Sequence, residues 1–210
     1  MQSDLESEIQ FARQHNIGDI LRRSAMRFPD KTAIICGQTE WTYKAFDTAC
    51  NQLARHLLAS GISAGDKIAV IARNSHGFAA IRFAIARIGA VLVPINFMLN
   101  ANEVRYILNS SRSKMLALGP EFIDIGLEAI SKGTDIEITL GLPSEHQSSS
   151  LKTDLRFEGL LTGDATAPEI HLDDRSLAQI VYTSGTEAMP KGAMLSHSAV
   201  LWQYTSCICL

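Results

Sequence analysis

The sequence predicts an α/β fold in which helices flank a largely parallel sheet. Short apolar runs alternate along the chain with segments whose apolar residues recur every three or four positions, the pattern of strand-helix-strand crossover units. Several runs, such as residues 67–72, are apolar throughout, as in strands covered on both faces. With 210 residues, 46% hydrophobic and 20% charged, the chain can bury a core as one large domain or two small ones.

The first elements are predicted to be a helix, a hairpin and a second helix. Asp19 is expected to cap a helix that Pro29 stops. Residues 32–36 and 40–43 should pair as strands around a turn at 37–39. Apolar residues recur at helical spacing from Phe46 to Leu57, and Gly61 follows where a left-handed C-cap is expected.

The central part should continue as alternating strands and helices. Gly89 is expected to close one helix, and Asn100 with Glu103 forms a capping-box pattern that opens another. The strands are predicted at 67–72, 90–95, 115–118 and 136–140, and the helices at 78–88, 101–109 and 122–131.

The regular pattern stops at a polar segment and resumes near the C-terminus. Residues 143–150, PSEHQSSS, are expected to form a surface loop that separates subdomains. Asp173 and Asp174 are interpreted as a helix cap before Leu177, and residues 180–182 as a strand. The apolar stretch at the C-terminus should leave an exposed patch, formed by Leu201, Trp202, Tyr204, Ile208 and Leu210.

Charge and composition favour small molecules as partners. The formal net charge is -3 without a clustered basic stripe, so we expect no nucleic-acid binding and no attraction to an anionic membrane. No transmembrane segment is expected, because Arg82 and Arg87 interrupt the most apolar stretch, residues 78–99. The N-terminus lacks the apolar core of a signal peptide. Four cysteines, at positions 36, 50, 207 and 209, are interpreted as buried free thiols in a cytoplasmic protein.

Residues 182–197, YTSGTEAMPKGAMLSH, have the composition of an anion-binding loop. Glycine allows backbone N–H groups to approach phosphate oxygens, hydroxyls add donors, and lysine supplies a counter-charge. The loop follows a strand, where ligands gather in open α/β sheets. It is not a Walker loop, because Pro190 precedes Lys191 and Gly192 follows it. The alternative from composition alone is an ordinary polar hairpin between two strands.

The same segment resembles the phosphate-binding signature of the adenylate-forming, or AMP-binding, superfamily. This superfamily includes acyl-CoA synthetases, peptide-synthetase adenylation domains and luciferases. The likeness extends from Ile17 to the C-terminus and includes IGAVLVPINFMLNANEVRYILNSSRSK at residues 88–114. Within the superfamily, VPINFML and TSGTEAMPKGAMLSH are most similar to bacterial fatty-acyl-CoA synthetases.

The resemblance implies ATP-dependent activation of a carboxylic acid through an acyl-adenylate to an acyl-CoA thioester, and the acid is expected to be a fatty acid of lipid metabolism. The implied ligands are ATP with Mg²⁺, the acid and coenzyme A. Glu187 and Ala188 depart from the usual threonine and glycine, and Glu187 is expected to point away from the triphosphate. No catalytic residue or metal ligand is assigned, and the implied ATP phosphate-binding residues are Thr183, Ser184, Gly185, Thr186, Lys191 and Gly192, with Glu187 in the same loop.

The resemblance also implies an incomplete enzyme. Residues 1–16 would be an N-terminal extension and 17–210 an incomplete AMP-binding N-terminal domain, with the phosphate loop at 183–192. The superfamily's later motifs would lie beyond Leu210, so we expect this chain alone to be inactive. The alternative is a truncated, non-catalytic nucleotide-binding or interaction protein. His197 is interpreted as a packing or capping residue, and Arg22, Arg23 and Arg27 as a solvent-facing stripe.

Overall fold

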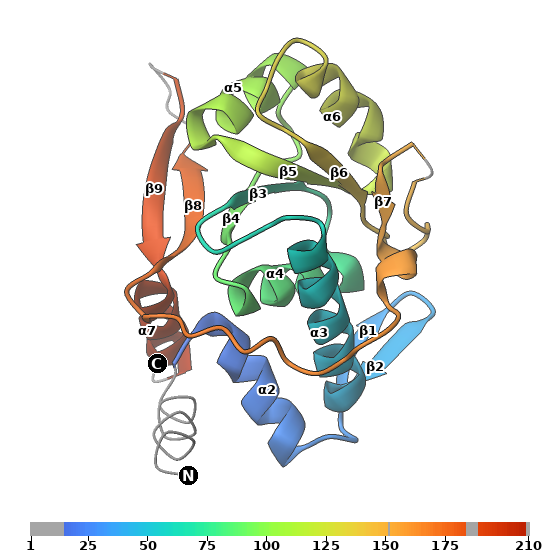
Figure 1. The fold of residues 1–210 in the computed structure, drawn as a ribbon. Helices are drawn as coiled ribbons and strands as arrows, with labels where there is room; N and C mark the ends of the chain where they lie inside the picture. Colours follow the sequence, from blue (N-terminus) through green and yellow to red (C-terminus); the bar gives the residue numbers. More distant parts are fainter. Residues whose placement is uncertain (1–14, 151, 184–188, 209–210) are drawn as a thin grey trace.

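A computed structural model describes residues 15–150, 152–183 and 189–208, which form an α/β fold (Figure 1). In chain order its elements are α2 Ile17–Arg27, β1 Thr32–Cys36, β2 Thr39–Thr42, α3 Tyr43–Ala59, β3 Lys67–Ile71, α4 His76–Arg87, β4 Val91–Pro94, α5 Ala101–Ser111, β5 Ser113–Leu118, the 3₁₀ turn η1 Pro120–Phe122, α6 Ile123–Ile130, β6 Ile138–Gly141, β7 Leu155–Arg156, η2 Phe157–Leu160, β8 Leu177–Thr183, β9 Lys191–Ser196 and α7 His197–Ile208.

The main sheet of the described residues has seven strands in the order β7-β6-β5-β3-β4-β8-β9. The six strands from β7 to β8 run parallel, and β9 pairs antiparallel with β8 at one edge. Strands β1 and β2 form a separate antiparallel hairpin, as predicted. The expected largely parallel sheet is therefore confirmed.

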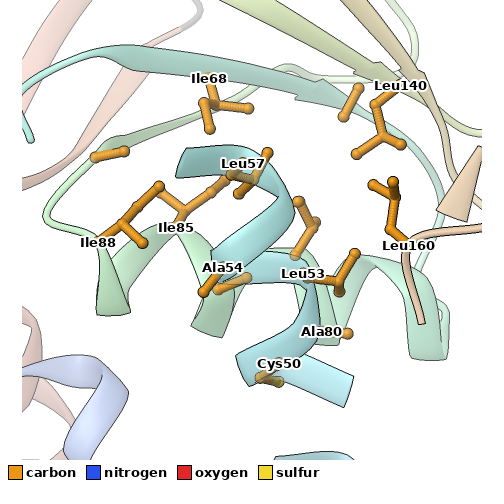
Figure 2. Close-up of a cluster of buried hydrophobic side chains, with 14 of the residues drawn as sticks. Cys50, Leu53, Ala54, Leu57, Ile68, Ala80, Ile85, Ile88, Leu140 and Leu160 are labelled. Carbon is orange, nitrogen blue, oxygen red and sulfur yellow. The ribbon is translucent and has the colours of Figure 1, made fainter. Parts of the chain in front are cut away.

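Helices cover both faces of the sheet because successive residues of its central strand point to opposite sides. Ile68 of β3 belongs to the core cluster with α3 and α4, whereas Ala69 belongs to the cluster with α5 and α6. Figure 2 shows Leu57 of α3 and Ile85 of α4 lying beneath Ile68. Two apolar layers thus enclose β3, which explains its uninterrupted apolar sequence.

The first helix begins earlier than predicted. Asn16, not Asp19, is the N-cap of α2, and Asp19 takes the third helical position of a capping box. The Asn16 side chain accepts from the Asp19 N–H at 3.2 Å, and the Asp19 carboxylate accepts from the Asn16 N–H at 3.1 Å. Asp19 also pairs with Arg22 at 2.9 Å. The interpretation of Arg22 as solvent-facing is wrong, since its side chain is only 21% exposed.

Asp173 and Asp174 do not cap a helix at Leu177, contrary to the prediction, because no helix begins there. The Asp173 carboxylate accepts from the Arg175 N–H at 2.8 Å, and its carbonyl accepts from the Ser176 N–H at 2.9 Å, which makes a turn. The turn leads into strand β8 at Leu177. Aspartate accepts backbone hydrogen bonds in turns as well as at helix starts, so its presence alone did not distinguish the two.

The polar segment at residues 143–150 contains no helix or strand, as expected. It does not separate two sheets, because β7 follows it and pairs with β6 in the main sheet. The Asn100–Glu103 capping box is confirmed. None of the helices in the described residues combines the length and apolarity that a membrane span requires.

The cysteines differ in exposure. Cys50 is fully buried as expected, and burial raises the pKa of its thiol to about 12. Cys36 is half-buried, but Cys207 is exposed, so the prediction of a buried thiol is wrong for Cys207. Cys209 lies outside the described residues.

The predicted apolar surface on the last helix is confirmed for three of its residues. Trp202 is 71% exposed, Tyr204 37% and Ile208 83%. Leu201 is buried in a cluster with Ile17 instead, so its prediction is wrong, and Leu210 lies outside the described residues. The helix therefore packs one side against α2 and exposes the other.

Candidate functional site

The β8–β9 hairpin carries the predicted phosphate loop. Thr183 ends β8, Lys191 begins β9, and the two residues are register partners across the hairpin. Because β8 runs parallel to β4, the loop leaves the sheet at the carboxyl ends of the parallel strands. Four of the predicted site residues lie between these two, outside the described residues: Ser184, Gly185, Thr186 and Glu187.

Gly192 allows a close approach between β9 and its neighbour. A Cβ at this position would lie 2.8 Å from Ile180 Cγ2 and 3.1 Å from Tyr182 Cζ. Any side chain would therefore collide with Ile180 and crowd the Tyr182 ring, both on β8. Gly192 was predicted to let the backbone approach phosphate, whereas its described contacts give it a packing role at the base of the loop.

Helix α5 contacts both arms of this hairpin. The Tyr106 hydroxyl donates to the carbonyl oxygen of Pro190 at 3.2 Å, and the Tyr182 hydroxyl donates to Ser110 Oγ at 2.9 Å. Figure 1 shows α5 beside the ends of β8 and β9 that bear the loop. Sequence reasoning missed these contacts, and the available signal was that Tyr106 and Ser110 are four residues apart on one helical face.

A cation and two aromatic rings gather in the loops that follow the other parallel strands. The Arg73 guanidinium, two residues beyond β3, lies 5.2 Å from the ring centroid of Phe97, which follows β4. Phe97 also lies 5.9 Å from Phe122, which follows β5. Phe97 remains 42% exposed, and Met98 is 81% exposed. The loops after β3, β4 and β5 therefore offer an apolar surface beside the positive charge of Arg73.

His76 lines a depression of about 510 Å³ in the surface. The other lining residues are those of the hairpin turn at 37–39, residues 143–148 and Glu158. Its ring packs edge-on against Trp41 and Phe157, at centroid distances of 5.2 and 5.8 Å. Burial lowers the pKa of His76, and the negative charge of Glu158 opposes this shift. These contacts account for His76 as an aromatic-packing residue.

His197 is fully buried at the start of α7. Its Nδ1 accepts from the Ile17 N–H at 3.3 Å, which ties α7 to the start of α2. Its Nε2 is buried without a hydrogen-bond partner among the described residues. Burial lowers the pKa of His197, while Asp19 and Asp174 raise it by a smaller amount. The expected packing role is confirmed.

This lowered pKa predicts acid sensitivity. The unfolded chain takes up the proton at an ordinary pKa of about 6.5, before the folded chain does. The stability that the neutral ring provides is therefore complete above about pH 6.5 and is lost as the pH falls toward the lower folded pKa. His197→Asn retains an acceptor near Nδ1 but cannot titrate, so its unfolding free energy should fall less between pH 7 and 5 in urea titrations. Parallel pH curves for the two proteins would contradict this role.

Solved structures of acyl-CoA ligases resemble this fold. The N-terminal domain of FACL13 from Mycobacterium tuberculosis, solved with an inhibitor, superposes with a TM-score of 0.75 at 29% identity, covering 88% of this chain and 45% of that one. A fatty acyl CoA synthetase from Mycobacterium tuberculosis gives a TM-score of 0.76 at 29% identity, covering 91% of this chain and 37% of that one.

Curated proteins of similar sequence include acid–CoA ligases. The long-chain-fatty-acid–CoA ligase FadD13 of Mycobacterium tuberculosis is 33% identical over 187 residues, covering 88% of this chain and 36% of that protein. The 4-hydroxybutyrate–CoA ligase 2 of Metallosphaera sedula is 32% identical over 183 residues, covering 84% of this chain and 33% of that protein. The chain spans about a third of the length of the curated relatives it matches. The model of the AMP-binding enzyme family matches residues 21–210, and the chain therefore belongs to that family.

Proposed function

We propose that this chain is the phosphate-binding part of an enzyme that activates a fatty acid with ATP and transfers the acyl group to coenzyme A. The observation that carries the proposal is the family match over residues 21–210, which includes the whole β8–β9 hairpin. The position of Thr183 opposite Lys191, at the carboxyl end of β8, supports an anion site there. Residues 17–210 then form the first part of an AMP-binding domain.

A carboxylate is a poor electrophile because its charge repels nucleophiles and an oxide ion leaves poorly. Attack of the carboxylate oxygen on the α-phosphorus of ATP releases pyrophosphate and gives an acyl-adenylate, from which a thiol displaces AMP. The loop residues position the β- and γ-phosphates and offset their charge, which are the main contributions a protein makes to such a transfer. Magnesium enters with ATP, bound to phosphate oxygens.

The names of the relatives support a fatty acid as the substrate class. FadD13 is named for long-chain fatty acids, and a relative from Streptomyces coeruleorubidus is named a fatty acid–[acyl-carrier-protein] ligase. Other relatives are named for benzoate and 4-hydroxybutyrate. We choose a fatty acid and coenzyme A because they recur in the names of both the sequence relatives and the solved structures.

Acid-dependent exchange of pyrophosphate into ATP tests the proposal. The measurement uses an extended chain. We define it as these 210 residues followed by the part of a matched relative's sequence that this chain does not cover. Fatty acids of increasing length should stimulate exchange, and coenzyme A should then yield the acyl thioester. The 210-residue chain alone should show no exchange. An extended chain that folds but exchanges with no carboxylic acid would refute the function.

Glu187 tests how the loop tolerates a negative charge. A carboxylate about 5 Å from a phosphate charge would be repelled by about 3 kcal/mol at an effective dielectric constant near 20. Because this repulsion would offset the contribution of Lys191, we predict that Glu187 points away from the triphosphate. Glu187→Gln in the extended chain should then change the affinity for MgATP less than about threefold. A tenfold gain would place the carboxylate at the phosphates, and a tenfold loss would indicate that it helps to hold magnesium.

A further inference from the structure

Helix α5 forms two hydrogen bonds to the base of the phosphate loop, one at each end of the loop. Tyr182 immediately precedes Thr183 at the end of β8, and Pro190 immediately precedes Lys191 at the start of β9. The Tyr182 hydroxyl is bonded to Ser110, and the Pro190 carbonyl is bonded to the hydroxyl of Tyr106. Each hydrogen bond therefore lies next to a predicted phosphate-binding residue, since Tyr182 adjoins Thr183 and Pro190 adjoins Lys191.

The contact to Pro190 controls the backbone that leads into Lys191. The proline ring fixes φ of residue 190 near −65°. A hydrogen bond to its carbonyl oxygen restricts ψ of Pro190, because rotation about the Cα–C bond would move the oxygen away from Tyr106. With both dihedrals restrained, the plane of the following peptide is set. Together with the pairing of Lys191 to Thr183, this plane defines the direction in which the Lys191 side chain leaves the strand.

We infer that Tyr106 is a positioning residue for ATP, whose hydroxyl holds the Pro190 carbonyl and thereby presents Lys191 to the triphosphate. This inference rests on the proposed function. Lys191 is exposed, and no carboxylate of the described residues forms an ion pair with it. Its long side chain therefore depends on the backbone for its direction. Presetting that direction lowers the conformational entropy lost when the anion binds.

Tyr106→Phe removes only the hydroxyl and keeps the half-buried ring. In the extended chain it should raise the KM for MgATP about three- to tenfold, the range expected for one net hydrogen bond, and leave the KM for the acid unchanged. Hydrogen exchange of the Lys191 and Gly192 amides should become faster, while exchange in β3 and β5 stays the same.

Tyr204→Phe is the matched control. It also deletes a tyrosine hydroxyl that is hydrogen-bonded to a residue distant in sequence, here Arg82 of α4, but Tyr204 lies on α7 and away from the loop. It should change neither kinetic constant nor the exchange at Lys191. Should Tyr106→Phe fail to accumulate, Ser110→Ala loosens the other arm from an exposed position and should raise the KM for MgATP in the same direction.

Three outcomes would overturn the inference. These are an unchanged KM for MgATP in Tyr106→Phe, an equal rise in the KM for both substrates, or unchanged exchange at Lys191. An equal rise in both KM values would show a general structural role of Tyr106. Faster hydrogen exchange without a change in the KM for MgATP would show that the Tyr106–Pro190 hydrogen bond does not contribute to ATP binding. A wild-type extended chain without acid-dependent exchange would instead refute the proposed function, before any variant is compared.

Discussion

Lys191→Ala in the extended chain should weaken MgATP binding or slow adenylation by about tenfold or more. Lysine is the one cation between Thr183 and Gly192 in the sequence, and a charge-assisted hydrogen bond to phosphate contributes about 1.5–3 kcal/mol. Thr183 and the backbone cannot supply that charge. Pyrophosphate exchange at varied MgATP concentrations measures the effect.

Lys132→Ala provides the control for general loss of positive charge. Lys132 is exposed in the turn after α6, far along the chain from the hairpin, and its removal should leave exchange unchanged. Equal activity of wild type and Lys191→Ala would show that Lys191 does not bind the phosphates. A loss that accompanies a lower unfolding free energy would point to folding instead.

Asp47→Ala should destabilise the 210-residue chain by about 3 kcal/mol, because it leaves a buried cation without its carboxylate. The Arg87 side chain is only 7% exposed and forms an ion pair with Asp47, which is 21% exposed. Arg87 also donates to Asn51 and, at 3.0 Å, to the Asp47 carbonyl oxygen. These contacts join α3 to α4 beneath the sheet. Urea titration gives the unfolding free energy.

The double variant Asp47→Ala with Arg87→Met separates charge from packing. Methionine fills much of the space of the arginine stem without a charge, so most of the lost stability should return. Asp124→Ala is the exposed counterpart: its partner Lys152 is 63% exposed and Asp124 87%, and breaking this pair should not change the unfolding midpoint measurably. Equal effects of Asp47→Ala and Asp124→Ala would contradict the buried-charge explanation.

The candidate site was predictable only in its local part. The residues from Tyr182 to Gly192 form a continuous signal, and the strand that leads into the loop was expected from the apolar run at residues 180–182. That these residues bind phosphate remains a prediction. For Tyr106 the sequence offered only its place one helical turn before Ser110, which does not identify a partner, because Pro190 lies 84 residues away.

The sequence by itself determined the elements whose signals lie within one helical turn or along one strand. The Asn100–Glu103 capping box and the left-handed Gly61 after α3 are of this kind, because neighbouring residues supply each interaction. Strand β3 was predictable because its apolar residues are consecutive in the sequence. Only the tertiary structure decided that β3 lies between β4 and β5, and that Leu201 is buried while Trp202 is exposed. Strand order and burial depend on contacts between residues far apart in the chain, and those contacts form only when the layers pack together.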